Sequence, residues 1–352
     1  MICALKQTLV LPPESFIPRN PIPMRMVRTA QGCRLCERGA KLVLFVSGEC
    51  NRRCFYCPLS EKKKGRDVIY ANERPVSRDD EIIEEAERMR ALGTGITGGE
   101  PLMFMERTTH LMRLLKKEFG ESHHIHLYTT VAIGKREAEE LHSAGLDEIR
   151  FHIIGSAGGY SKSVEFSKAT GMSTGVELPA IPGDERRISD AVSLGIDFLN
   201  LNELEFSETN REKMVRRGYD TENGISATGS AGFARRLVRL YGRSVPINFC
   251  SSNFKDGVQL RRRLLRTAKN VAKEYEGVTE DGTIMRAVIE NCDIEVPGAH
   301  ERVGGRIYTS VDVLERIADR LPPRAVAYIS EVYPTWDALE VEREYVKGRG
   351  RV

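Results

Sequence analysis

Apolar and polar residues along most of this chain follow two alternating patterns, one typical of strands and one typical of helices. Short apolar runs predict buried strands, and longer stretches with apolar residues three or four positions apart predict amphipathic helices. In the stretch 79–92, Ile82 and Ala86 lie on one helical face, and Gly93 follows as a helix stop. The predicted strands span residues 42–47, 94–97, 124–129, 148–153, 175–181, 198–206 and 245–251, and predicted helices between them span 79–92, 106–119 and 135–143.

This alternation of strands and helices predicts right-handed parallel βαβ units. Six or seven units within about 210 residues suit a whole or partial (β/α) barrel, with a doubly wound open sheet as the alternative. In a barrel, functional residues gather at the carboxyl ends of the strands. Three candidate functional residues, Cys50, Gly98 and Cys250, lie after or at the ends of predicted strands.

The two ends of the chain depart from this pattern. Residues 1–39 are proline-rich and irregular and end in the motif Cys33-x-x-Cys36. The sequence beyond residue 255 predicts a basic helix over 255–275, a hairpin turn at 280–283, a helix near 311–320, a strand near 325–333 and a final charged helix. We therefore predict an N-terminal extension (1–39), a catalytic core (40–255) and an α+β C-terminal extension (256–352).

Composition adds little to this picture. Of 352 residues, 41% are hydrophobic and 29% are charged, and the formal net charge of +3 gives no general reason to expect nucleic-acid binding. No apolar run approaches the roughly 18 residues that cross a bilayer. The first residues lack a basic segment followed by a sustained apolar run, so no signal peptide is predicted. We expect a cytoplasmic protein without membrane contact.

The eight cysteines are unevenly distributed, since five lie between residues 33 and 57. In a reducing compartment, clustered cysteines more often bind metal or react than form disulfides. Cys50, Cys54 and Cys57 form a CxxxCxxC motif directly after the first predicted strand. A [4Fe–4S] cluster usually takes four thiolates, so three local thiols leave one iron open for a small ligand. Part of a structural zinc site is the alternative interpretation of this motif.

CxxxCxxC after a first strand, with the aromatic Tyr56 before the last cysteine, resembles the signature of the radical S-adenosylmethionine (SAM) superfamily. This resemblance implies a partial (β/α)6-type TIM barrel with N-terminal and C-terminal extensions. It also implies that the open iron chelates SAM, which the reduced cluster cleaves to a 5′-deoxyadenosyl radical that abstracts hydrogen from substrate. Within the superfamily, the chain looks most similar to uncharacterised, often archaeal, proteins related to the pyruvate formate-lyase activating enzyme.

A second motif, Gly98-Gly99-Glu100-Pro101, follows the second predicted strand. Two glycines allow a ligand to approach the backbone closely, and the family uses such a segment to hold the aminium group of SAM. The resemblance further implies that residues on the middle strands contact SAM. The resulting candidates for cofactor binding are Tyr56, Gly98, Gly99, Glu100, Arg150, His152 and Glu177.

Several other polar residues lie on otherwise apolar strands. His124 and His126 share one strand face, and Asn200 and Asn202 share another. Burying such polar groups without water or a hydrogen-bond partner costs free energy. They therefore predict an interior that holds water or a ligand. Ordinary structural hydrogen bonding is at least as good an explanation for each of them.

Cys33 and Cys36 stand apart from the other motif. A strand over 41–47 spans roughly 20 Å, which would separate them from the CxxxCxxC loop. They could form half of a second metal site, zinc or iron–sulfur, completed by Cys3 or Cys292, or they could be buried reduced thiols. Cys250 could likewise bind metal or meet substrate, but a buried thiol explains it best.

The sequence leaves three functions open. The first is a radical SAM enzyme acting on a small molecule, peptide or protein, with an electron donor such as ferredoxin or flavodoxin. The second is a radical SAM enzyme that modifies RNA, bound through the basic stretch 255–275. The third is a non-catalytic scaffold that binds zinc or a cluster. The basic stretch has a plainer interpretation as a solvated helix face.

Overall fold

The computed structural model describes residues 29–221 and 223–348, and the chain divides into two compact units. The first unit contains the described residues up to Ala86 together with Ala91–Gln259, and the second contains Glu87–Arg90 and the residues from Leu260 onward. Cys3 lies outside the described residues.

The first unit is built on one curved sheet whose central strands are parallel. Its strand order is β3-β2-β1-β4-β5-β6-β7-β8-β9, so that the described strands β3 and β9 form the two edges and the barrel is partial. Parallel pairing runs from β1 through β4 to β9, and β2 and β3 add an antiparallel hairpin beside β1. The strands are β1 (Lys41–Phe45), β2 (Ile69–Ala71), β3 (Arg74–Val76), β4 (Gly93–Thr97), β5 (His124–Thr129), β6 (Glu148–Phe151), β7 (Ser173–Ala180), β8 (Phe198–Glu203) and β9 (Ile247–Cys250).

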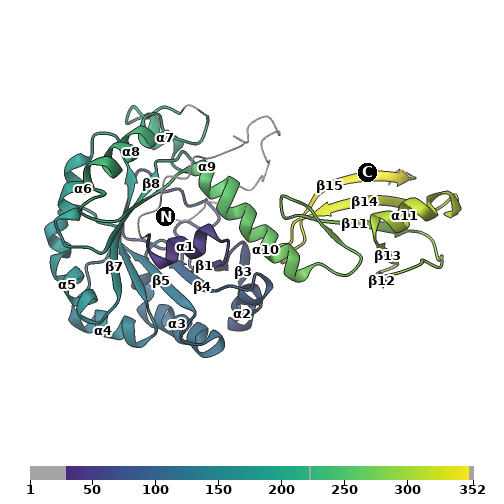
Figure 1. Cartoon of the computed structure of the whole chain (residues 1–352), viewed down its shortest axis with the longest axis horizontal. Coiled ribbons are helices and arrows are strands. Elements are labelled where there is room, and N and C mark those ends of the chain that lie inside the picture. Colours follow the sequence, from purple (N-terminus) through teal and green to yellow (C-terminus); the bar gives the residue numbers. More distant parts are fainter. Residues whose placement is uncertain (1–28, 222, 349–352) are drawn as a thin grey trace. The chain divides into compact units, whose positions relative to one another are not determined.

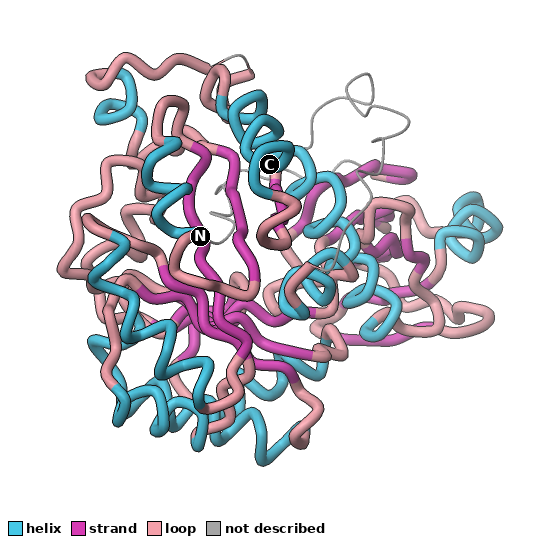
Figure 2. Tube along the Cα trace, turned by 60° about the vertical axis from the view of Figure 1, so that its left-hand side comes forward, coloured by secondary structure: helices cyan, strands magenta, loops and turns pink. Residues whose placement is uncertain are grey.

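Helices α3, α4, α5, α6 and α8 cover the outer side of this sheet, and α1 lies on its inner side (Figure 1). Figure 2 shows the same strands running side by side within the layer of helices. The helices of this unit are α1 (Gln31–Glu37), α2 (Asp79–Arg88), η2 (Pro101–Phe104), α3 (Met105–Phe119), α4 (Lys135–Ser143), η3 (Ala157–Tyr160), α5 (Ser161–Ala169), α6 (Glu185–Val192), α7 (Arg211–Val215), α8 (Ser230–Tyr241), α9 (Ser252–Phe254) and the π-helical turn η4 (Lys255–Leu260).

The two faces of the parallel strands differ in polarity. On β5 and β6, Ile125, Leu127, Ile149 and Phe151 are fully buried on the face that packs against the helices. The alternating residues of the same strands are polar and point inward, because a strand presents successive side chains to opposite faces. The outer face thus supplies the apolar core, and the inner face supplies the functional groups described below.

The seven predicted core strands all correspond to observed strands, and the partial barrel is confirmed. The prediction for residues 1–39 was wrong in one respect, because residues 31–37 form helix α1 rather than irregular chain. This helix has seven residues, includes Gly32 and has no apolar periodicity, so the pattern of the sequence gave no signal for it.

The second unit is an antiparallel sheet with the strand order β12-β13-β11-β14-β15, and β10 pairs with β11. A small apolar core around Ile289, Leu314 and Ala327 joins this sheet to α11. The elements are α10 (Arg261–Val271), β10 (Gly277–Val278), β11 (Ile284–Glu290), β12 (His300–Val303), β13 (Arg306–Thr309), α11 (Val311–Ile317), η5 (Ala318–Arg320), β14 (Val326–Val332) and β15 (Glu340–Lys347).

The predicted final helix of the chain was wrong, since Glu340–Lys347 is strand β15. Its alternation of Val341, Tyr345 and charged residues suits a strand that pairs with β14 on one side only.

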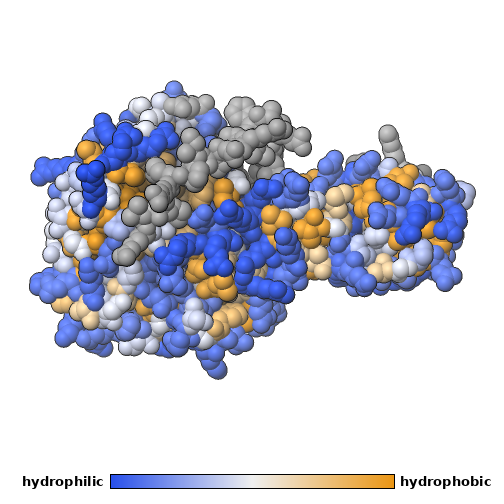
Figure 3. Space-filling model, viewed as in Figure 1, coloured by the Kyte–Doolittle hydropathy of each residue, from blue (hydrophilic) through white to orange (hydrophobic). Residues whose placement is uncertain are grey.

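None of the described helices has the length and apolar character that a bilayer span requires. Figure 3 shows hydrophilic residues over most of the visible face of the first unit, with smaller apolar patches between them.

Candidate active site

The CxxxCxxC motif lies in the long loop between β1 and β2. Cys50, Cys54 and Cys57 are free, half-buried thiols, and a hydrogen bond from the Cys57 amide to the Cys54 carbonyl (3.2 Å) closes the CxxC turn. Burial raises the pKa of Cys50, and negative charge on Glu100 and the other two thiols raises it further. The three thiols lie within eight residues of one loop, and a bound cation would favour their thiolate forms.

Tyr56 anchors this loop to the barrel. Its side chain is buried in an apolar cluster, and its hydroxyl lies 2.8 Å from Nε2 of His152. Nδ1 of His152 lies 3.0 Å from the Glu177 carbonyl oxygen, so Nδ1 donates there and Nε2 accepts from Tyr56. Burial, with Arg187 nearby, lowers the pKa of His152 to about 3, which keeps the ring neutral. The apolar cluster around Tyr56 comprises Ile181, Leu204, Phe206, Met214 and Ala227.

Asn210, which precedes α7, fixes the loop from the other side. Its amide Nδ2 donates to the carbonyl oxygens of Tyr56 (3.1 Å) and Glu205 (2.9 Å). The sequence contained no motif that singled out this residue. Its role depends on a contact between segments about 150 residues apart, which no local pattern reveals.

The GGEP segment runs directly beside the start of the cysteine loop. The Gly99 amide donates to the Ser47 carbonyl (2.7 Å), and the Glu100 amide donates to the Glu49 carbonyl (2.8 Å). A Cβ atom on Gly98 would lie 2.5 Å from the Ser47 oxygen, and one on Gly99 would lie 2.2 Å from the Glu49 oxygen. Side chains at either glycine would therefore force the two loops apart. The structure thus brings the two motifs predicted from the sequence side by side.

The Glu100 carboxylate is fully buried and accepts four hydrogen bonds. Oε1 accepts from Thr129 Oγ1 (2.6 Å) and the Leu102 amide (3.1 Å), and Oε2 accepts from the amide and hydroxyl of Thr130 (both 2.6 Å). The side chain therefore fastens the GGEP segment to the carboxyl end of β5, and it has little capacity left for a ligand.

Replacing Glu100 with glutamine is expected to lower the free energy of unfolding by about 1–3 kcal/mol, since one pair of donors would then face an NH2 group. Urea denaturation of the cluster-free protein measures this loss. Glu106→Gln, at an exposed position on α3, serves as the control and should leave the urea midpoint unchanged. Equal urea midpoints for Glu100→Gln and the wild type would show that the four hydrogen bonds do not contribute to the stability of the fold.

Arg150 and Glu177 meet in the barrel interior. Nη1 of Arg150 donates to Glu177 Oε2 (2.8 Å), and Nε donates to Glu148 Oε1 (2.6 Å). Asn200 and Asn202 donate to the two oxygens of Glu177 at 2.9 and 2.7 Å. These contacts confirm that the polar strand residues point inward, and they show that structural hydrogen bonds occupy most of the polar atoms.

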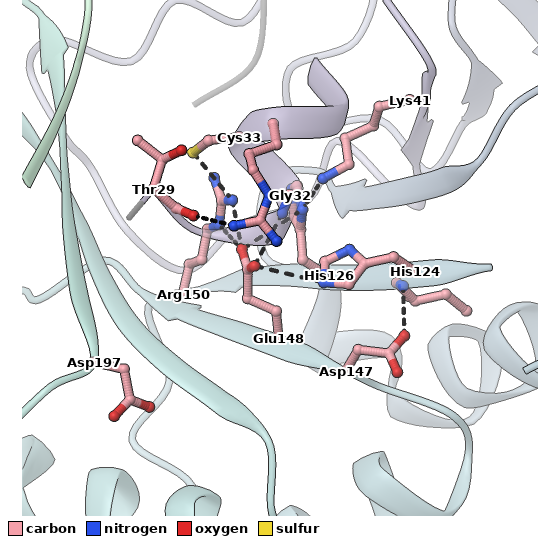
Figure 4. Close-up of polar contacts among 12 residues, drawn as sticks. Thr29, Gly32, Cys33, Lys41, His124, His126, Asp147, Glu148, Arg150 and Asp197 are labelled. Carbon is pink, nitrogen blue, oxygen red and sulfur yellow. Dashed lines mark hydrogen bonds and ion pairs between the residues drawn. The ribbon is translucent and has the colours of Figure 1, made fainter. Parts of the chain in front are cut away.

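Helix α1 enters this interior at the end where the strands begin (Figure 4). The Gly32 amide donates to Glu148 Oε2 (3.1 Å), and the Cys33 thiol lies 3.4 Å from Nη2 of Arg150. A Cβ atom on Gly32 would lie 2.3 Å from Nδ1 of His126, so only glycine fits there. Lys41, the first residue of β1, contacts the same nitrogen of His126.

Charge within this network is closely balanced. Burial alone would raise the pKa of Glu148, but Arg150 and Lys41 outweigh it and hold the pKa below its ordinary value. Burial, and then Arg150, lower the pKa of Lys41 to about 8. The sequence did not single out Lys41, because a lysine at a strand start ordinarily lies in solvent.

Helix α1 packs against the first residues of the strands, whereas the CxxxCxxC loop follows the end of β1. Cys33 therefore lies at the opposite end of the barrel from that loop, near Asn200 (3.3 Å) and Asn248 (3.5 Å). Within the described ranges, no group of three or more His, Cys, Asp or Glu side chains, those of Cys50, Cys54 and Cys57 included, is arranged to hold a metal ion. A second metal site at Cys33 and Cys36 thus remains a prediction without support.

The two remaining described cysteines lie in packed surroundings. Burial raises the pKa of Cys250, whose sulfur lies 3.5 Å from the Gln259 amide nitrogen. Cys292 packs against the core of the second unit.

Several basic residues of the predicted RNA-binding stretch 255–275 contact acidic side chains. Lys255 pairs with Glu205 (2.7 Å) and is itself buried. Arg261 pairs with Asp281 (3.1 Å), and Lys273 pairs with Glu301. The helix α10 also ends at Val271 rather than at residue 275. Since internal ion pairs occupy these charges, the stretch offers a poorer phosphate-binding surface than its sequence suggests, and nothing supports the RNA alternative.

Comparison with known proteins identifies a family model and a relative of this chain. A model of the radical SAM superfamily matches residues 44–157, and a model of a domain of unknown function, DUF8061, matches residues 276–346. A protein of Methanocaldococcus jannaschii, provisionally named as a glycyl-radical enzyme activating enzyme, is 40% identical over 344 residues. This alignment covers 89% of the present chain and 92% of that protein.

Two solved structures show weaker similarity. Streptococcus suis SuiB bound to its precursor peptide SuiA gives a TM-score of 0.43 at 14% identity, over 72% of this chain and 61% of that one. Coproporphyrinogen III oxidase (HemN) of Escherichia coli, a radical SAM enzyme, gives a TM-score of 0.40 at 12% identity, over 65% of this chain and 60% of that one. The chain thus spans under two thirds of either protein.

The family model matches the segment that carries both motifs, and the archaeal relative is similar over nearly its whole length. The chain therefore belongs to the radical SAM superfamily, whose members are enzymes that use a [4Fe–4S] cluster and SAM.

Proposed function

We propose that this enzyme cleaves SAM reductively at a [4Fe–4S] cluster held by Cys50, Cys54 and Cys57. The observation that carries the proposal is the direct backbone pairing of the cysteine loop with the GGEP segment, from Gly99 to Ser47 and from Glu100 to Glu49. Two motifs about 40 residues apart in the chain thereby form one continuous ligand-binding edge. Three thiols on an exposed loop suit a [4Fe–4S] cluster in which one iron has no protein ligand and can bind a further molecule.

The donor chemistry of the site fits such a cluster. All three thiols are free, none is exposed on the surface, and they come from one loop of eight residues. When bound there, the cluster and SAM supply a 5′-deoxyadenosyl radical, which takes a hydrogen atom from the substrate. The protein contributes positioning and the exclusion of water.

Each part of the chain has a separate task in this proposal. Gly98 and Gly99 align the edge that receives the amino group of SAM, and Glu100 holds that edge against β5. Tyr56 and His152 fix the last turn of the cysteine loop. The apolar cluster behind Tyr56 keeps water from the thiols on that side.

For Arg150 and Glu177, which the resemblance suggested as cofactor-binding residues, we propose an indirect role. Nη1 of Arg150 and Oε2 of Glu177 form an ion pair at 2.8 Å in the barrel interior. The Glu177 backbone carbonyl also orients the His152 ring. We therefore assign them as positioning residues that act on the cofactor site through His152.

The substrate proposed for this enzyme is a protein, from which the radical abstracts hydrogen at a glycine. The name of the archaeal relative, similar over 92% of its length, supports this assignment. An activating enzyme also needs an electron donor, and a ferredoxin or flavodoxin would supply the reducing electron.

Anaerobic reconstitution tests the proposed reaction. The protein reconstituted with iron and sulfide should show the broad visible absorbance of an iron–sulfur cluster. After reduction with dithionite, it should convert SAM to 5′-deoxyadenosine, measured by liquid chromatography and mass spectrometry. A protein that binds the cluster but releases no 5′-deoxyadenosine would refute the proposed reaction.

A further inference from the structure

An open cleft of about 350 Å³ lies beside the cysteine loop. Residues of this loop, of the segment after β6, of α6 and of the segment after α7 line it. Cys54 belongs to the lining, so a molecule in this cleft would lie next to the proposed cluster. The volume is within the range of small-ligand sites. The lining residues are Arg52, Arg53, Cys54, Phe55, Tyr56, Ile154, Gly155, Arg187 and Arg217.

Four arginines line this cleft, and no carboxylate does so among the described residues. Arg53 and Arg217 are exposed, and neither forms an ion pair with a carboxylate in the described part of the chain. The Arg217 guanidinium instead lies 4.6 Å from the centre of the Phe55 ring. The Arg52 guanidinium donates to the hydroxyl and carbonyl oxygens of Thr130, at 3.4 and 3.5 Å, and its backbone amide donates to Cys50 Sγ (3.3 Å). These charges repel one another unless an anion binds between them.

Arg187 supplies a guanidinium that is already oriented. Nη1 lies 3.3 Å from Asp184, and Nη2 donates to the Ile153 carbonyl and lies 3.5 Å from the Tyr56 hydroxyl. Asp184 offsets only one of the four guanidinium charges, so the arginines keep an excess of positive charge, part of which the neighbouring cysteine thiolates would balance. Preorganised donors bind an anion at a smaller cost in side-chain entropy than mobile ones.

SAM itself does not match this charge. At neutral pH it carries an ammonium group, a sulfonium group and one carboxylate, and is therefore a net cation. A cleft with several uncompensated arginines opposes its binding. The remaining positive charge of the cleft matches an anionic group of a second ligand better than it matches SAM.

We propose that this arginine-lined cleft binds a carboxylate or phosphate group of the substrate. Guanidinium groups form paired, charge-assisted hydrogen bonds with both kinds of anion. The inference rests on the proposed function, because it takes the neighbouring cysteine loop as the radical-generating centre. Under the proposed function, the anion is an acidic side chain of the protein substrate; a free small-molecule acid is the alternative source that the experiment distinguishes.

Anion binding to the reconstituted protein tests the inference. Isothermal titration calorimetry at low ionic strength would measure the binding of inorganic phosphate and of a short glutamate-rich peptide, each with and without saturating SAM. Arg53→Gln and Arg217→Gln should each weaken binding about tenfold, the loss expected for one charge-assisted contact. The matched control is Arg216→Gln, which removes the same charge from an exposed arginine that pairs with Glu212 (2.5 Å) outside the cleft.

Tighter binding of the peptide than of phosphate would support a protein source for the anion, and the reverse order would support a small-molecule source. The inference is overturned if the wild type binds neither probe, if SAM displaces them, or if Arg216→Gln weakens binding as much as Arg217→Gln. Cleavage of SAM by the wild-type preparation is measured in parallel. Cleavage without anion binding refutes only this inference, whereas anion binding without cleavage refutes the proposed function and with it the assignment to a substrate.

Discussion

Replacing Cys54 with alanine should reduce the visible absorbance of the reconstituted protein and its release of 5′-deoxyadenosine to background. A cluster with only two protein thiolates lacks the ligands that hold it against loss to solution. Cys50→Ala and Cys57→Ala should have the same effect, because the three thiols lie on one loop and no other described cysteine lies on it. Iron analysis, absorbance and product release measure the loss.

Cys33→Ala provides the control for this experiment. Cys33 lies at the opposite end of the barrel, beside Arg150 and Asn200. The variant should keep both the cluster and the cleavage of SAM. Loss of the same cluster in Cys33→Ala would contradict the separation of the two cysteine motifs, and retention of cleavage in Cys54→Ala would contradict the ligand assignment.

The second large effect concerns stability. Arg150→Met should lower the free energy of unfolding by about 3–5 kcal/mol, the usual result of removing one partner of a buried ion pair. Glu148 and Glu177 would both remain buried without their shared cation. Urea denaturation of the cluster-free protein, followed by circular dichroism, measures the change.

Arg186→Ala is the matched control for Arg150→Met. The Arg186 side chain is 95% exposed, and its ion pair with Asp190 is long at 3.9 Å. Because water screens this pair, its removal should hardly change the free energy of unfolding. Unfolding midpoints that are equal for Arg150→Met and Arg186→Ala would contradict the structural role assigned to the interior network.

The barrel strands were predictable from the sequence because each buried strand is a compact apolar run followed by a helix with a clear apolar face. At both ends of the chain, the pattern of apolar residues did not predict the observed elements. Helix α1 is held by contacts from Gly32 and Cys33 to Glu148 and Arg150, which are more than 100 residues away. Strand β15 depends on pairing with β14, and its charged sequence resembles an exposed helix when read alone.

The predicted limits of the core (40–255) and of the extension (256–352) stay predictions.

Some residues of the candidate site could be predicted from the sequence, and others could not. The cysteine and GGEP motifs were predictable because their chemistry is local, and each occupies a few consecutive residues. The roles of Asn210, Arg187 and Arg217 were not, because each depends on a meeting of distant segments around the cysteine loop. Arg150 and Glu177 were found as candidates, but their mutual pairing could only be seen once the fold had joined β6 to β7.

Labelled SAM offers the most direct test of the central claim, that three thiols leave one iron of the cluster for SAM. The measurement is the magnetic coupling between the reduced cluster and SAM labelled with 15N at its amino group, by electron–nuclear double resonance. The account predicts a coupling strong enough to require direct coordination by the nitrogen, which Cys33→Ala should retain. A reconstituted, reduced wild-type protein that binds SAM without any such coupling would contradict the account.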